Sequence, residues 1–102
     1  MLDYTKTRQL EEDFERYMLK FYAKYKRFSL EDFGDFAATI LNYNVQNNVI
    51  DAQEKGAYAA FLVSLYNKGI GNRITEEHQR QIANAIASDY SVNFTVIKEL
   101  FG

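Results

Sequence analysis

The first half of the chain repeats apolar and polar residues with the period of a helix. Apolar side chains recur every three or four residues over 7–28, which predicts a first helix. A second apolar stripe follows over 30–41, and Ser29 is its predicted N-cap because a serine hydroxyl accepts hydrogen bonds from first-turn amides. Four asparagines over 42–48 favour turns and left-handed backbone. The sequence therefore predicts that the chain reverses there.

A third helix is predicted after Asp51 and Glu54, which have the spacing of a capping box. Nearly every residue over 57–66 is apolar, so this helix is expected to be enclosed on most sides. Gly69 is the predicted left-handed residue at its end, since glycine adopts that backbone conformation without a steric penalty.

Two more helices complete the predicted fold. Thr75 is the predicted N-cap of a fourth helix, whose apolar face runs to Tyr90. Ser91 is a candidate cap for a short fifth helix over 92–101. The start of this segment also alternates as a strand would, but the chain offers no partner strand. We therefore expect an all-α fold, a compact bundle of about five helices in a single domain over 1–102.

Composition supports a small soluble domain and narrows the range of partners. A chain of 102 residues that is 47% hydrophobic is typical of one folded core. Its net charge of −2 gives no overall attraction to nucleic acid or anionic lipid. The longest uncharged run, 56–67, is shorter than the roughly 20 residues of a membrane-spanning helix. With a polar N-terminal segment, no signal peptide and no cysteine, the expected location is the cytoplasm, away from membranes.

The chain lacks the usual constellations of catalytic or metal-binding residues. His78 is the only histidine, so a Ser-His nucleophile or a transition-metal centre has little to build on. Its neighbours Glu76 and Glu77 are adjacent in sequence and splay around a helix instead of converging. Gly69 and Gly71 fit a helix end better than a phosphate-binding loop. We predict no catalytic residue, no metal site and no cofactor, and therefore no enzymatic activity.

Candidate binding residues lie near the end of the first predicted helix. Lys20, Lys24 and Arg27 fall within about a turn and a half of one another, so they could hold an acidic partner or a phosphate backbone. The alternative is a solvated helix end that complements its own dipole. Tyrosine is favoured at protein interfaces, and Tyr22 and Tyr43 are the two that we expect to be exposed.

Two functions remain open from the sequence. The first is a small regulatory, inhibitor or accessory protein that binds another protein, and the size and helical content of the chain suggest such a protein from bacteria or their phages. The second is a DNA-binding or DNA-associated regulator, which would use either the basic end of the first helix or the C-terminal helix pair. The segment 81–100 partly matches a helix-turn-helix, although its connection is too long and Lys98 is its one basic residue after the turn. Self-association through exposed aromatic residues is a further alternative.

Overall fold

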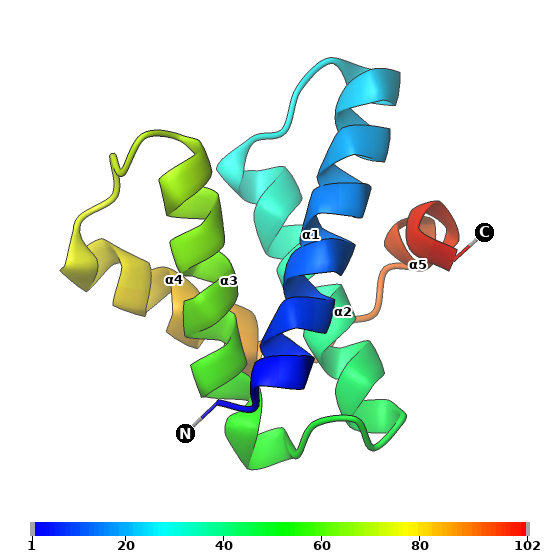
Figure 1. Cartoon of the computed structure of the whole chain (residues 1–102), viewed down its shortest axis with the longest axis vertical. Helices are drawn as coiled ribbons and strands as arrows, with labels where there is room; N and C mark the ends of the chain where they lie inside the picture. Colours follow the sequence, from blue (N-terminus) through cyan, green and yellow to red (C-terminus); the bar gives the residue numbers. More distant parts are fainter. Residues whose placement is uncertain (1, 102) are drawn as a thin grey trace.

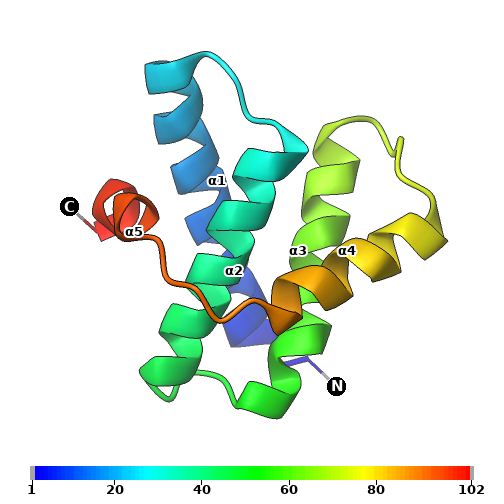
Figure 2. The same ribbon diagram turned by 180° about the vertical axis from the view of Figure 1, so that it is seen from behind.

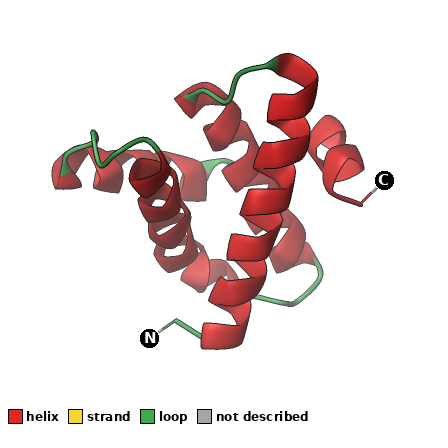
Figure 3. Ribbon diagram, turned by 45° about the horizontal axis from the view of Figure 1, so that its top comes forward, coloured by secondary structure: helices red, strands yellow, loops and turns green. Residues whose placement is uncertain are grey.

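Helices form the regular structure of residues 2–101, the part of the chain that the computed structural model describes, and no strand occurs among them (Figure 3). The elements are α1 (Tyr4–Tyr25), α2 (Leu30–Gln46), the short 3₁₀ helix η1 (Ala52–Glu54), α3 (Lys55–Gly69), α4 (Glu76–Ser88) and α5 (Phe94–Phe101). The prediction of an all-α fold with about five helices is confirmed.

α1 occupies the middle of the molecule, with α3 along one side and α5 along the other (Figure 1). α2 lies behind α1 in this view (Figure 1), and α4 packs mainly against α3. The connection from α4 to α5 crosses the back of α2 (Figure 2). The radius of gyration is 12.6 Å, which is close to the roughly 13 Å of one compact domain of this length. All five helices contribute buried residues to one hydrophobic core.

Aromatic rings fill much of that core. Tyr17 of α1 stacks on Phe36 of α2 with ring centroids 4.7 Å apart, and Phe33 stacks on Tyr66 at 4.8 Å. Tyr58 is also fully buried. Such pairs add to the stabilisation that comes from burying the rings. Much of the aromatic content of the sequence is thus used in packing and not at the surface.

The boundaries of α1 differ from the predicted ones. The helix begins earlier than expected because the Asp3 carboxylate accepts two first-turn amides. It ends before Lys26, which adopts a left-handed conformation with φ 59°. The predicted extension to Phe28 is therefore wrong, although the Phe28 ring folds back against the core. The Ser29 cap is confirmed, and Ser29 forms a complete capping box with Asp32.

α2 continues through most of the segment 42–48, so the predicted reversal there is wrong for most of its length. The physical reason is that Asn42 is buried and has partners elsewhere in the fold. Its Nδ2 donates to the backbone oxygens of Asp89 at 2.7 Å and Ser91 at 3.1 Å. Its Oδ1 accepts from Lys55 Nζ. An asparagine with tertiary partners of this kind stays helical, and it fastens the α4–α5 connection to α2.

Of the predicted capping positions of α3 and α4, two are confirmed and one is wrong. Asp51 and Glu54 form their capping box, which opens η1 ahead of α3. Thr75 accepts a first-turn amide of α4. Gly69, in contrast, is the last helical residue of α3, and the left-handed glycine is Gly71, with φ 86°. The left-handed residue comes two positions later than predicted because Ile70, with φ −100°, caps α3 and its amide donates to carbonyls of the last turn.

The segment between α4 and α5 corrects two further predictions. Tyr90 lies beyond the end of α4 and is 85% exposed, so it does not continue the apolar face of that helix. Asn93, and not Ser91, accepts the first-turn amides of α5. Asn93 also donates from Nδ2 to Asp35 and from its backbone amide to Thr39. These contacts fix where α5 starts on the surface of α2.

Burial of Asp13 in α1 makes stability depend on pH. Burial raises the pKa of its carboxyl above the ordinary value, although hydrogen bonds from Gln9 and Arg16 lower it in part. A raised folded-state pKa means that the folded protein holds this proton more tightly than the unfolded chain does. The protonated Asp13 carboxyl therefore stabilises the fold at low pH. This contribution is lost as pH rises from roughly 4, the ordinary pKa of an Asp, through the raised pKa of Asp13.

We expect Asp13→Asn to remove this loss. Melting temperatures of the wild type and the variant are measured at a series of pH values. As pH rises through that window, the wild-type melting temperature should fall relative to that of the variant. A difference that moves in favour of the wild type would contradict the raised pKa.

Candidate functional site

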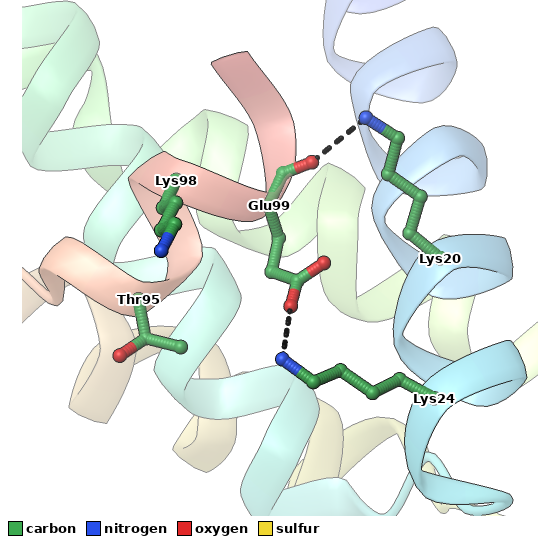
Figure 4. A pocket seen from close by; sticks show the side chains of 5 residues that line it. All are labelled: Lys20, Lys24, Thr95, Lys98 and Glu99. Carbon is green, nitrogen blue, oxygen red and sulfur yellow. Dashed lines mark hydrogen bonds and ion pairs between the residues drawn. The ribbon is translucent and has the colours of Figure 1, made fainter. Parts of the chain in front are cut away.

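A basic groove runs between the C-terminal half of α1 and the side of α5. We call it the α1–α5 groove, and its volume is about 480 Å³. The side chains that line it are Lys20, Lys24, Thr95, Lys98 and Glu99 (Figure 4).

Helical spacing brings these side chains together on facing surfaces. Lys20 and Lys24 are one turn apart on α1, so both point towards α5. The groove residues of α5 are likewise three and four positions apart. Val96 and Leu100 lie on another face of α5 and are buried against the core. Burial of that apolar face places the polar side of this short helix beside the lysines.

Glu99 is the contact point between the two walls. Lys20 Nζ donates to the Glu99 backbone oxygen at 2.9 Å, and Lys24 Nζ lies 3.3 Å from Glu99 Oε1 (Figure 4). Hydrogen bonds to Tyr25 and Glu99 raise the pKa of Lys24, so its ammonium stays charged. No ion pair within residues 2–101 involves Lys98. Three lysines and one carboxylate leave the groove with an excess of positive charge.

The structure brings two of the predicted basic residues together and separates the third. Lys20 and Lys24 both line the groove, whereas Arg27 lies past the end of α1. The Arg27 Nε is 3.3 Å from Asp32 Oδ2, and its guanidinium lies over the Phe21 ring. Arg27 therefore contributes to the turn between α1 and α2 and is not part of the groove.

The two tyrosines expected at the surface differ in their environments. Tyr22 is 56% exposed, which confirms the prediction for that residue. It lies two positions after Lys20, and this spacing turns it to a different face of α1. Tyr43 is partly buried, and its ring stacks on Phe101 with centroids 5.2 Å apart. The prediction of a freely exposed Tyr43 is wrong because the end of α5 covers it.

Sequence reasoning did not identify the contribution of α5 to this site. Thr95, Lys98 and Glu99 come from a segment more than 70 residues from the lysines of α1, and no local spacing signals such a contact. Phe94 and Phe101, also on α5, are 81% and 51% exposed. The sequence does carry one signal of this contribution, the amphipathic pattern of the last helix. Burial of its apolar face places its polar residues at the surface, where they can line a site.

The remaining chemistry of the described residues is sparse. No group of three or more His, Asp or Glu side chains within 2–101 is placed to hold a metal ion. His78 is exposed in the first turn of α4, on a shallow surface shared with Thr75 and Glu77. Along the described part of the chain, no helix is both long and apolar enough to span a membrane. The chemistry that the α1–α5 groove offers is the binding of carboxylate or phosphate groups by ammonium ions.

The last two helices do not pack as a helix-turn-helix pair. α4 packs on α3, while α5 packs on α1 and α2 after the connection has crossed α2 (Figure 2). A recognition helix normally packs against the helix that precedes it, and α5 does not pack in this way.

Comparisons of this chain with protein-family models, with curated proteins and with solved structures found no match.

Proposed function

We propose that the protein acts by binding an acidic segment of another protein in the α1–α5 groove, without performing chemistry of its own. The contact between Lys24 and Glu99 is the main support. In this contact a lysine of the groove pairs with a carboxylate, which is the interaction that an acidic residue of the partner would form. Lys20 donates to a backbone oxygen of Glu99 and Lys24 pairs with its carboxylate, whereas the Lys98 ammonium has neither kind of partner within residues 2–101. Lys98 therefore offers a further site for a partner's carboxylate.

Exposed aromatic side chains favour a protein as the partner. α5, the helix that also carries one wall of the groove, bears Phe94, which is largely exposed, and Phe101, which is half exposed and stacked on Tyr43. Large aromatic side chains contribute much of the binding energy at protein interfaces, where they leave water for a partner's apolar surface. A partner that combines acidic and apolar residues would use both features of α5.

DNA binding is less well supported by the same groove. Its lysines and the Thr95 hydroxyl are suitable for phosphate contacts. However, Glu99 adds a negative charge within the groove, and the net charge of the chain is −2. These charges oppose an acidic peptide as well, but duplex DNA carries one charge per roughly 1.7 Å and needs a wider basic surface than three lysines, whereas a short acidic segment does not. We therefore place a protein partner first and treat DNA as the competing outcome of the test.

Lys98→Glu tests the proposal while leaving the contacts between α1 and Glu99 intact. The probe is a short fluorescein-labelled peptide of repeated Asp-Leu-Glu triplets, and the readout is fluorescence anisotropy. Reversing one charge in the groove is expected to weaken binding about tenfold, because an attraction of order 1 kcal/mol becomes a repulsion. Binding by the wild type should also weaken as salt concentration rises.

Arg80→Glu provides a matched charge reversal on α4, away from the groove, and should change the affinity less than about twofold. A probe with Asn and Gln in place of its acidic residues should bind poorly. If Arg80→Glu weakens binding as much as Lys98→Glu does, or if duplex DNA binds tightly while the acidic probe does not, the proposal is wrong.

A further inference from the structure

A second groove lies on the other side of α1, where it meets α3, and its chemistry is opposite to that of the α1–α5 groove. We call it the α1–α3 groove, and its volume is about 370 Å³. Its lining residues are Glu11, Phe14, Glu15, Met18, Leu65, Lys68 and Gly69. A smaller cavity of about 140 Å³ shares Phe14, Met18 and Gly69 and extends towards Phe28 and Ile70.

The floor of the α1–α3 groove is apolar. Phe14 is buried at its base, and Met18 and Leu65 form partly buried parts of the two walls. Methionine adapts to partners of different shape because its side chain is unbranched and polarizable. Leu19 and Tyr22, also on α1, are 68% and 56% exposed. Apolar surface therefore extends from the groove onto the outer side of α1.

Acidic side chains stand along the α1 wall. Glu11 and Glu15 are one turn apart, and like charges at this spacing destabilise a helix slightly. Other acids of α1 have basic partners within the helix: Glu12 pairs with Arg8 at 3.4 Å. No ion pair within residues 2–101 involves Glu11 or Glu15. The two carboxylates thus remain available to a basic partner that enters the groove.

We infer that the α1–α3 groove docks a basic amphipathic helix of a partner protein. An apolar groove between two packed helices can bind the apolar face of a third helix, as in other helix-in-groove complexes. Lys or Arg side chains beside that face would reach Glu11 and Glu15, while Met18 and Leu65 would contact the apolar residues. Two carboxylates on the α1 wall outnumber the one ammonium, Lys68, on the α3 wall, so the charge of the groove selects a basic helix over an acidic one.

This inference is independent of the α1–α5 groove, which selects the opposite charge. α3 and α5 lie on opposite sides of α1 (Figure 1), so the two grooves that they form with α1 do so too. A chain with both would connect an acidic partner to a basic one across the width of a single helix. If one groove does not bind its expected partner, the proposal for the other groove is unaffected, so the two proposals can be tested separately.

The test uses the full chain and a fluorescein-labelled model helix of Leu and Lys residues with one apolar face. A second probe with Glu at every Lys position is the charge control. The double variant Glu11→Gln/Glu15→Gln is expected to bind the basic helix fivefold to tenfold more weakly, roughly the loss of two exposed ion pairs. Met18→Ala should also weaken binding, because it removes apolar contact without changing charge.

Two variants serve as matched controls. Glu76→Gln/Glu77→Gln removes the same charge from exposed residues of α4, and Lys98→Glu alters the other groove. Neither should reduce the affinity by more than about twofold. Thermal melting should show that every variant remains folded. The inference is overturned if the basic helix does not bind, if the acidic helix binds equally well, or if the α4 variant loses as much affinity as the α1 variant.

Discussion

Phe36→Ala is expected to lower the free energy of unfolding by about 3–5 kcal/mol, the range for a buried phenylalanine. Phe36 is 0% exposed, and its ring lies in the middle of the aromatic core. It stacks on Tyr17 at 4.7 Å and meets Phe14 at 5.9 Å. Truncation would remove these contacts and leave a cavity between α1 and α2. Since small domains are stable by only about 5–15 kcal/mol, the variant should be close to unfolding.

Phe94→Ala is the matched control for this prediction. The same side chain is removed, but Phe94 is 81% exposed, so the loss should stay within about 0.5 kcal/mol. Urea unfolding of both variants measures the two values. If Phe36→Ala costs as little as Phe94→Ala is expected to cost, Phe36 is not a core residue and the packing of α1 on α2 described above is incorrect.

Asn42→Leu is expected to cost about 2–4 kcal/mol because it leaves a buried charge without its hydrogen bond. Lys55 is 6% exposed, and its ammonium donates to Asn42 Oδ1. The Tyr90 ring, with its centroid 4.8 Å from Nζ, gives only partial compensation. The backbone oxygens of Asp89 and Ser91 would also lose their donor. The α4–α5 connection should therefore loosen as the domain is destabilised.

Adding Lys55→Met should recover at least half of that loss, since the buried ammonium is then absent. The four proteins of this double-mutant cycle, compared by urea unfolding, give the coupling between the two residues directly. Additive effects of the two substitutions would mean that Asn42 and Lys55 do not interact in the folded protein.

Much of the fold could be predicted from local sequence. The three-to-four spacing of apolar residues identifies the helices, and the caps at Ser29 and Thr75 are correct because a cap depends on side chains within a few residues. Errors arose where distant contacts override local preference. Asn42 is typical of a turn, yet it stays helical because its partners lie across the fold.

The candidate site could be predicted only in part for the same reason. Lys20 and Lys24 are identifiable as a basic helix face, because their spacing is local. Their contact with Glu99 depends on how α5 packs, and α5 is placed by Asn93 and by burial of its apolar face. The exposure of Tyr43 is not predictable from its own segment, because Phe101 of the same helix, α5, stacks on its ring. Tertiary packing, which local patterns do not encode, decides which basic and aromatic residues remain available.

A titration of the ¹⁵N-labelled protein with the Asp-Leu-Glu peptide, followed by NMR, is the most direct test of the proposed acidic-partner site. If the α1–α5 groove binds acidic segments, the backbone amide signals that move should be those of Lys20, Lys24 and the residues from Thr95 to Glu99. Signals of Glu11 and Glu15 should stay in place. Shifts confined to the α1–α3 groove, or no shifts at all, would contradict the proposal.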